Sequence, residues 1–382
     1  MRHQICTKCC IDTTVLGVKF DQSGECNFCK MHNELDQEFP LNQQGQKKFK
    51  IIIQKIIKAG RGRKYDCVVG ISGGRDGCYT LYLAKKLGLR PLAVHFNDGF
   101  GNPVAGENMT NVTKKLGVDL KTVTSDWRES KDIRIAFLKA STPDLGMPND
   151  LGIATALYSS ALQENIKYVL VGHSFRTEGV APIGWLYMEG RYLQDVHGRF
   201  GKIKLRKWQP LDPGFNLGLY QLAYYTIFKR IKTIFPLYMV NYVRDEVDDI
   251  LSNELDWVYP GAHHLDDLYQ SLMTYILRVK FNIDRRILHY GALIRSSQMS
   301  REEALDRMKD VYVIEDPKVI DLCLKRLGLS QEEFDNILKI PKKTFLDYKT
   351  NLSTLKRFKY LIKLLTYVDL FPKSTYLKYF EY

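Results

Sequence analysis

The sequence predicts an α/β protein built on a doubly wound parallel sheet. Four short runs rich in Val, Ile and Leu alternate with longer amphipathic segments, as strands do when crossover helices connect them in a parallel sheet. Each run ends in a loop that contains Gly, Asn, Asp or Ser. With 382 residues, of which 45% are hydrophobic, the chain is long enough to bury two or more cores.

The expected elements alternate along the first half of the chain. Apolar residues recur every three or four positions in the helical segments, whereas the strands are short and rich in β-branched residues. Helices are expected at residues 47–59, 76–87, 105–116 and 150–165, and strands at residues 66–71, 91–96, 120–124 and 168–171. From residue 217 onward the pattern is almost wholly helical.

The turn between the first strand and the next helix is the most informative motif, Ser72-Gly73-Gly74-Arg75-Asp76-Gly77. Glycines let the main chain approach an anion, the serine hydroxyl and exposed N–H groups donate hydrogen bonds, and the start of a helix favours negative charge. The motif lacks the Gly-Lys-Ser/Thr ending of a Walker loop and the three glycines of the dinucleotide fingerprint. It predicts a phosphate-binding turn, with a purely structural Gly-Gly turn as the alternative.

Polar and glycine residues also follow the other three expected strands. They are Asn97-Asp98-Gly99, Asp126-Trp127 and Gly172-His173-Ser174. Ligands of doubly wound sheets bind beyond the carboxyl ends of the strands, so all four loops are expected to face one crevice. Their convergence favours an ATP site over a structural turn.

Cysteines are concentrated near the start of the chain. Cys6 and Cys9 form one Cys-x-x-Cys pair, and Cys26 and Cys29 form a second. Four thiolates at this spacing suit tetrahedral zinc in a closed structural site, with free thiols as the alternative. The first twenty residues contain no apolar secretory signal, so disulfides are not expected. The apolar alternation of residues 15–20 is typical of the small hairpin of a zinc ribbon.

The net charge of +13 is unevenly distributed. Residues 1–220 contain 31 Lys and Arg against 21 Asp and Glu, so most of the excess lies with the expected nucleotide site. ATP and a sugar nucleotide would account for part of it, and no nucleic-acid partner is expected. Residues 204–208 are basic and aromatic, which indicates either contact with an acidic sugar nucleotide or a surface hairpin.

Charged residues interrupt the longest apolar stretch, 217–243, so we expect no membrane span and a cytoplasmic location.

Three cations also lie close together later in the chain, namely Lys280, Arg285 and Arg286. Such a cluster indicates a site for the diphosphate or carboxylate of a substrate, and a solvated helix face is the alternative.

A set of motifs that spans most of the chain carries a family resemblance. The turn at residues 72–77 resembles the PP-loop of ATP pyrophosphatases, with Gly77 at a position where that family usually has Ser. The wider set is Cys-x-x-Cys, Asp21-x-x-Gly24-x-Cys26, Ser72-Gly73-Gly74-x-Asp76, His95-x-Asn97-Asp98-Gly99, Pro148-x-Asp150, Gly172-His173-Ser174-x-x-Thr177-Glu178, His263-His264 and Asp284-Arg285-Arg286-x-x-His289. It resembles the N-acetyl sugar amidotransferase family of bacterial surface-polysaccharide and flagellin-sugar biosynthesis.

The resemblance implies an enzyme that converts an acetamido group of a nucleotide-activated sugar to acetamidino through an O-adenylyl intermediate. ATP and Mg²⁺ would serve the reaction, beside structural Zn²⁺. The chain contains no glutaminase signature, so the ammonia would come from a partner glutaminase complex that resembles imidazole glycerol phosphate synthase. A PP-loop enzyme of tRNA thiolation is the alternative. Only Cys67, Cys78 and Cys323 follow the cysteine-rich segment, however, and they form no Cys-x-x-Cys pair.

The resemblance and the residue patterns together assign four groups of candidate site residues. The candidates for ATP binding are Ser72, Gly73, Gly74, Arg75, Asp76, Gly77 and Gly172. The catalytic candidates are Asp76 for Mg²⁺, Asp98 and Glu178 for Mg²⁺ or ammonium, and His173 for proton transfer, with loop-capping carboxylates and a hydrogen-bonded histidine as alternatives. The substrate-binding candidates are Asp150, His264, Lys280, Arg285 and Arg286. The metal ligands are Cys6, Cys9, Cys26 and Cys29.

The chain is expected to divide into four parts. They are a zinc ribbon at 1–34, a PP-loop ATP-binding domain at 35–215, a helical substrate or partner region at 216–335 and a basic helical tail at 336–382. The expected fold is thus an α/β, Rossmann-like PP-loop parallel sheet with an N-terminal zinc ribbon and a helical C-terminal region.

Overall fold

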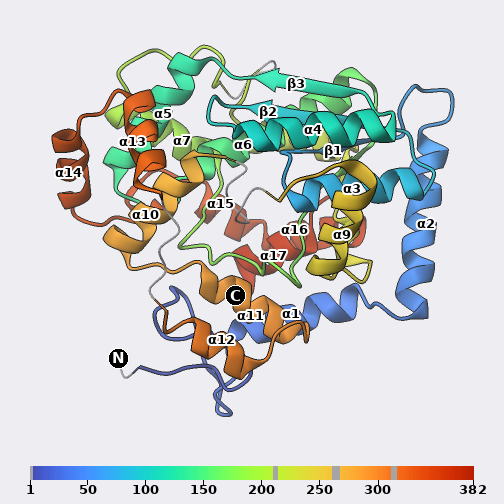
Figure 1. The fold of residues 1–382 in the computed structure, drawn as a ribbon, viewed down its shortest axis with the longest axis horizontal. Helices are drawn as coiled ribbons and strands as arrows, with labels where there is room; N and C mark the ends of the chain where they lie inside the picture. Colours follow the sequence, from blue (N-terminus) through green and yellow to red (C-terminus); the bar gives the residue numbers. More distant parts are fainter. Residues whose placement is uncertain (1–2, 210–213, 260–266, 311–315) are drawn as a thin grey trace.

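A five-stranded parallel sheet forms the centre of the molecule (Figure 1). The computed structural model describes residues 3–209, 214–259, 267–310 and 316–382. The strands are β1 (Cys67–Gly70), β2 (Pro91–Asn97), β3 (Leu120–Thr124), β4 (Tyr168–Leu170) and β5 (Lys232–Ile234). Their order is β3-β2-β1-β4-β5, and every neighbouring pair is parallel. The α/β fold with a parallel sheet is therefore confirmed.

The strand order places a topological switch point between β1 and β4. The chain proceeds outward from β1 through β2 to β3 and then returns to the other side of β1 as β4. At such a point the loops that follow two adjacent strands diverge, and the crevice between them is where doubly wound sheets bind ligands. The turn at residues 72–74 follows β1, and the loop at residues 172–174 follows β4.

Seven helices belong to the first two hundred residues. They are α1 (Asn27–Glu38), α2 (Gln43–Ala59), α3 (Arg75–Lys86), α4 (Pro103–Leu116), α5 (Trp127–Ala140), α6 (Met147–Gln163) and α7 (Gly190–Phe200). Helix α3 packs against β1, β2 and α4, whereas α6 packs against β1, β2 and β4. Right-handed crossovers place α3 and α4 on one face of the sheet and α6 on the other. Both faces are thus covered, which explains why the central strands are continuously apolar.

Two elements differ from the sequence-based expectation. Helix α5 fills a segment for which no element was predicted, and the side chain of Asp126 caps its first turn by accepting from the Arg128 N–H. Strand β5 lies in the region that was expected to be wholly helical. It has three residues, too few for a periodic pattern, and the free edge of β4 specifies its conformation through backbone pairing.

The remainder of the chain is otherwise helical, as predicted. Its α-helices are α8 (Leu219–Ala223), α9 (Arg244–Leu255), α10 (Tyr269–Phe281), α11 (Arg286–Arg295), α12 (Arg301–Arg307), α13 (Pro317–Leu327), α14 (Gln331–Lys339), α15 (Leu352–Arg357), α16 (Lys359–Tyr367) and α17 (Lys373–Phe380). Short helical turns cover residues 224–228, 236–238 and 345–347. Within the described ranges, each helix is too short or too polar to cross a membrane.

The N-terminal segment packs beside α11 and α12 at one end of the molecule (Figure 1). Two isolated antiparallel bridges, Ile5 to Asp12 and Phe20 to Cys26, replace the hairpin that was expected at residues 15–20. Helix α1 begins directly after Cys26, so the second cysteine pair spans the helix start. Within residues 15–20, Val15 is buried, Leu16 is exposed and Phe20 forms the second of these bridges.

Candidate active site

The turn after β1 is held in a conformation that only glycine adopts easily. Gly73 has a φ of +86°, and a Cβ there would lie 2.0 Å from the Ala105 carbonyl oxygen of α4. Its own carbonyl accepts hydrogen bonds from Asn108 Nδ2 at 3.1 Å and from Trp257 Nε1 at 2.9 Å. The carbonyl is thus fixed by two side chains, which leaves the main chain of the turn in a defined orientation at the start of α3.

The two loops of the switch point touch at Gly172. A Cβ at this position would lie 2.5 Å from the carbonyl oxygen of Asp76 and 2.7 Å from the Gly77 nitrogen. At Gly77 itself, a Cβ would lie 3.1 Å from the Gly70 oxygen. The absence of a side chain at Gly172 lets the loop after β4 lie against the first turn of α3, and its absence at Gly77 lets that turn lie close to the end of β1.

A cavity of about 1130 Å³ opens beside these loops. Six of the residues that were predicted to bind ATP or substrate, or to act in catalysis, line it together: Arg75, Asp150, His173, Glu178, Arg285 and Arg286. They come from α3, α6, the loop after β4 and the region at the start of α11, so segments more than 200 residues apart in the sequence meet here. The cavity is slightly larger than the roughly 300–1,000 Å³ of typical ligand pockets.

Arg75 contributes a fixed cation to the wall of the cavity. It is 7% exposed and donates through Nε and Nη2 to the two carboxylate oxygens of Asp248 on α9. The ring of Tyr259 lies 5.2 Å from its guanidinium carbon. Burial is the largest influence and opposes the charge, but the hydrogen bond to Asp248 and the nearby negative charge together raise the pKa of Arg75. The guanidinium therefore stays charged and ordered, as a phosphate contact requires.

Asp76 lies in the first turn of α3, where the helix dipole favours a carboxylate. It accepts a hydrogen bond from the hydroxyl of Tyr242, which is 2% exposed. Burial and the nearby negative charge of Asp76 raise the pKa of Tyr242, so the phenol remains a donor. The donor set at this position suits a hard cation such as Mg²⁺, since a carboxylate oxygen is its preferred protein ligand.

His173 is oriented by a chain of hydroxyl groups. Its Nδ1 lies 2.9 Å from the Tyr238 hydroxyl, which donates in turn to Ser374 Oγ of α17 at 3.4 Å. When the Tyr238 proton goes to Ser374, the matching tautomer of His173 donates Nδ1–H to the tyrosine oxygen and keeps the lone pair on Nε2. This tautomer gives the ring a proton acceptor on the side away from Tyr238.

Glu178 and the cations of α11 form the opposite part of the lining. Glu178 Oε1 accepts from the Ser174 N–H at 3.0 Å, and Arg285 Nη1 donates to Gln270 Oε1 at 3.0 Å. Arg286 forms a bidentate pair with Asp284, with contacts of 3.0 and 2.7 Å. These bonds hold two guanidinium groups at the edge of the cavity.

Two carboxyl groups in the cavity hold their protons more tightly than usual. Burial raises the pKa of Asp150 from 3.8 to about 6, and it raises the pKa of Asp144 to a similar value. Asp144 also accepts from the Tyr192 hydroxyl at 2.9 Å. Nearby positive charge from Lys378 of α17 partly offsets the burial of Asp150.

Of the predicted ATP-binding residues, only Arg75 is among those that line this cavity; Ser72, Gly73, Gly74, Asp76, Gly77 and Gly172 are not. Two further predicted residues, Asp98 and Lys280, do not line it either. Asp98 is 6% exposed and forms a buried ion pair with Arg134, so its carboxylate is engaged inside the protein and does not suit a Mg²⁺ ligand. Lys280 is 7% exposed and donates through Nζ to the Ile337 carbonyl at 2.6 Å, which ties α10 to α14. His264 lies outside the described residues.

The four predicted metal ligands converge at the N-terminal end of the molecule. Cys6, Cys9, Cys26 and Cys29 are buried, and their sulfur atoms lie within 4.8 Å of one another. The sulfur–sulfur distances of 3.8, 3.7 and 3.6 Å match the edge of a tetrahedron, which is about 3.8 Å for a metal–sulfur bond of about 2.3 Å. All four corners are filled by protein, so the cluster fits a closed, structural metal site.

The cysteine cluster is tied to α11 and α12, the helices beside the cavity. Arg301 donates to the carbonyl oxygens of Cys9 at 3.1 Å and Cys6 at 2.9 Å. Arg295 Nη1 lies 3.6 Å from the Cys9 sulfur, and Cys10 contacts the Ile287 carbonyl. The metal site therefore supports the position of the helix that carries Arg286.

Sequence patterns did not identify Tyr242, Asp248, Asp144 or Tyr238. Each lies outside the motifs, and Tyr242 and Asp248 contact residues that are 166 and 173 positions away. Tyr238, Tyr242 and Asp248 lie in the region 216–335, which was expected to bind the substrate or a partner, whereas Asp144 lies in the expected ATP-binding domain.

Comparisons with known proteins give one family match. Residues 259–363 match the family described as LPS biosynthesis protein WbpG-like, C-terminal domain. An uncharacterized protein of Methanocaldococcus jannaschii is 35% identical over 94 residues, which are 24% of this chain. The matched part spans 33%, about a third, of the length of that relative.

Several solved structures have a similar backbone over much of the chain. The NMN synthetase of Francisella tularensis is 15% identical and overlaps 74% of this chain and 96% of its own, with a TM-score of 0.33. The NH₃-dependent NAD synthetase of Campylobacter jejuni is 16% identical over 78% of this chain and 98% of its own, with a TM-score of 0.31. A tRNA thiolase of Methanococcus maripaludis is 17% identical over 86% and 99%, with a TM-score of 0.32. TM-scores this low carry no inference about function, so the match to the WbpG-like C-terminal domain is what the comparisons contribute.

Proposed function

We propose that this protein is an ATP-dependent N-acetyl sugar amidotransferase that converts an acetamido group of a nucleotide-activated sugar to acetamidino in surface-polysaccharide biosynthesis. One observation carries the proposal: the turn after β1 and the loop after β4 meet beside a cavity lined by Arg75, Asp150, His173, Glu178 and Arg286. The match of residues 259–363 to an LPS biosynthesis domain supports the substrate class.

The first step activates a poor electrophile. The acetamido oxygen attacks the α-phosphorus of ATP, a new P–O bond forms, and the bond to the β-phosphate breaks and releases pyrophosphate. In this proposal the N–H groups of residues 72–74 and the guanidinium of Arg75 hold the departing pyrophosphate. Asp76 would hold Mg²⁺, which supplies charge neutralisation for the departing group when bound.

The second step replaces oxygen by nitrogen. Ammonia attacks the imidate carbon, the bond from carbon to the AMP oxygen breaks, and AMP leaves with the former acetamido oxygen. One proton is lost from the incoming nitrogen, and Nε2 of His173 is the acceptor in this proposal. Arg285 and Arg286 would bind the diphosphate or carboxylate of the sugar nucleotide, since guanidinium groups match these anions.

Two components are proposed around this reaction. Zinc in the cysteine cluster would stabilise the N-terminal segment, because the four thiolates match its ligand type and geometry. Ammonia would come from a separate glutaminase, which resembles imidazole glycerol phosphate synthase.

The tRNA-thiolation alternative is less well supported. Sulfur transfer requires accessible cysteines near the nucleotide, whereas Cys67, Cys78 and Cys323 are each 0% exposed. A thiolation mechanism would have to use the four cysteines that form the closed cluster.

Formation of AMP tests the proposal. The wild-type enzyme, supplied with ATP, Mg²⁺, ammonium and a nucleotide-activated diacetamido sugar, should form one AMP and one pyrophosphate per acetamidino product. The Asp76→Asn variant should fold and lose most of this activity. The control is Glu332→Gln, which should retain the AMP-forming activity. It also removes an acid from the first turn of a helix, but at an exposed position of α14. Equal turnover in both variants would contradict the assigned role of the loop.

A further inference from the structure

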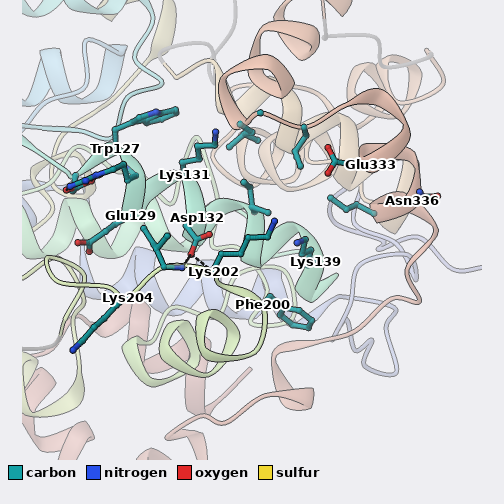
Figure 2. Close-up of a pocket in the computed structure, with 18 of the residues that line it drawn as sticks. Trp127, Glu129, Lys131, Asp132, Lys139, Phe200, Lys202, Lys204, Glu333 and Asn336 are labelled. Atoms are coloured by element: carbon teal, nitrogen blue, oxygen red, sulfur yellow. Dashed lines mark hydrogen bonds and ion pairs between the residues drawn. The ribbon is translucent and has the colours of Figure 1, made fainter.

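A second large cavity, of about 1150 Å³, lies apart from the site described above. It is bounded by α5, by the segment that follows α7, and by α13, α14 and the residues after α14 (Figure 2). Its lining residues are all different from those of the proposed active site. The proposed amidotransferase reaction leaves this cavity without a role.

Positive charge dominates the lining. Seven cationic side chains face four carboxylates, which leaves a net charge of +3 around the hollow. Within the described parts of the chain, Lys131, Lys139 and Lys202 form no ion pair with a carboxylate. Figure 2 shows these three lysines among the side chains that surround the hollow between α5 and the segment after α7. Three ammonium groups gathered around one hollow repel one another, so an anion bound between them would be stabilised.

The four carboxylates of the lining accept hydrogen bonds from neighbouring groups of the protein. Asp132 accepts from His197 Nε2 at 2.8 Å and from the Lys202 N–H at 2.9 Å, and Glu129 accepts from three consecutive N–H groups of residues 206–208. Asp126 caps α5 and pairs with Arg128, while Glu333 completes the capping box of α14. These carboxylates therefore shape the loops of the cavity. The backbone N–H of Ser330, together with the nearby charges of Lys202 and Lys139, lowers the pKa of Glu333, so this carboxylate offsets part of the positive charge.

The cavity also has an apolar wall. Ile135, Leu327, Ile337 and Ile340 line it, and the aromatic rings of Trp127 and Phe200 stand at its sides (Figure 2). Trp127 is 36% exposed, although one side of its ring lies 5.4 Å from the ring of Phe100. A ligand that combines charge with an apolar or aromatic body would cover this surface and contact the lysines at once.

We infer that this cavity is a second binding site, which takes a phosphorylated ligand with an apolar or aromatic body. Lys131, Lys139 and Lys202 bind the phosphate, and Trp127 and Phe200 contact the body. A nucleotide and an alkyl phosphate share this chemistry, and the two probes of the experiment distinguish them. The basic stretch 204–208, for which the sequence indicated contact with an anion, lies at the rim of the same cavity through Lys204 and Arg206.

Binding measurements on matched charge variants test the inference. The pocket variant is Lys131→Gln/Lys139→Gln/Lys202→Gln. The control, Lys50→Gln/Lys55→Gln/Lys58→Gln, removes the same charge from exposed positions of α2. Each protein is titrated calorimetrically with ADP and with hexyl phosphate. The pocket variant should bind at least one of the two probes about tenfold more weakly than the wild type, or weaker still. The control should bind both probes with the wild-type affinity. ADP that binds at the turn after β1 contributes equally to the titrations of all three proteins. A difference in affinity between them therefore reflects binding in the second cavity.

Fluorescence locates the ligand. Binding of hexyl phosphate should quench tryptophan emission in the wild type, and Trp127→Phe should remove that change. Quenching by ADP should only decrease in this variant, because Trp257 lies at the turn after β1. Lys202→Glu, at an exposed position that can change without unfolding the chain, should weaken binding by itself. Equal affinities in the wild type, the pocket variant and the control would overturn the inference. Loss of single-stranded RNA binding in the pocket variant, with both phosphate probes unaffected, would also overturn it and indicate a nucleic-acid surface.

Discussion

At the scale of single residues, the proposed active site depends on glycines, which have no side chain, as much as on charged residues. Gly73 and Gly172 allow two loops and a helix to meet at distances that a Cβ would prevent. The sequence could identify both glycines through their place after apolar strands. It could not reveal that Gly172 touches the first turn of α3, because that contact joins residues about 95 positions apart in the sequence.

The substitution Gly172→Ala tests this close packing. A methyl group here would lie 2.5 Å from the Asp76 oxygen, so the loop after β4 must move away from α3. We expect a loss of unfolding free energy of about 1–3 kcal/mol, together with loss of ATP turnover. Gly198→Ala is the control, because it lies inside α7 with no atom within 4 Å of its Cβ. It should stabilise the protein by about 0.5–1 kcal/mol through helix propensity. Similar unfolding free energies for the two variants would contradict the contact.

The carboxyl group of Asp150 predicts a defined pH dependence of stability. Burial raises its pKa from 3.8 to about 6 in the folded protein, so ionisation favours the unfolded chain. Stability is lost as the pH rises from about 4 to about 6 and stays lower above that range. Asp150→Asn removes this cost.

Urea unfolding of the Asp150→Asn variant at two pH values checks the direction. Near pH 7.5 the variant should be more stable than the wild type by about 1–3 kcal/mol, whereas near pH 4 the two should have nearly equal unfolding free energies. A difference that is the same at both pH values would show that burial does not raise the pKa of this carboxyl group.

At the scale of elements, the N-terminal cysteine cluster and the helices beside the cavity form one unit. Arg301 and Arg295 of the helical region contact the backbone and a sulfur of the cysteine pairs. The spacing of the cysteines predicted that they would converge. It did not predict this attachment, because the arginines lie almost 300 positions further along the chain.

Loss of the metal should therefore affect more than the N-terminal segment. Cys26→Ser should release about one metal ion per chain and lower the melting temperature, since metal binding and folding are coupled in such sites. It should also reduce turnover, because α11 carries Arg286 and loses support from the cluster. Metal analysis and thermal unfolding check the first effect, and Cys323→Ser, a buried cysteine outside the cluster, is the control. Unchanged metal content in Cys26→Ser would refute the assignment of the ligands.

The elements that the sequence did predict are those with a periodic pattern. Strands β1 to β4 and helices α2, α3, α4 and α6 lie where apolar spacing placed them, within a few residues. Strand β5 was missed because three residues carry no periodicity and its conformation depends on an edge formed by β4. Helix α5 was missed although Asp126 supplies a capping signal, because Asp126-Trp127 was interpreted as a ligand-binding loop and not as the start of a helix.

At the scale of the whole molecule, the cavity is assembled from most of the chain. Sequence motifs named Arg75, His173, Glu178 and Arg286, since each lies in a short pattern of chemically informative residues. They could not name Asp248, which orients Arg75, because an acidic residue on a helix has no distinguishing pattern until the fold places it. Motifs thus identified the groups expected to do the chemistry, and the fold identified the groups that hold them.

The source of ammonia gives a prediction about the isolated chain. If this chain only activates the sugar and accepts ammonia, high ammonium chloride should replace the glutaminase partner, and glutamine alone should give no product. A glutaminase of the cysteine type needs an accessible thiol, whereas each of the three cysteines outside the N-terminal segment is buried. Mass spectrometry of the sugar product checks this. Efficient use of glutamine by the purified chain, or sulfur in the product, would contradict it.

The fate of the acetamido oxygen tests adenylylation most directly. A nucleotide-activated diacetamido sugar labelled with oxygen-18 in the reacting acetamido group is incubated with the enzyme, ATP, Mg²⁺ and ammonium, and the products are analysed by mass spectrometry. Attack of that oxygen on the α-phosphorus predicts that each acetamidino product is matched by one AMP carrying the heavy oxygen. Heavy oxygen in inorganic phosphate or in water, with AMP unlabelled, would contradict it.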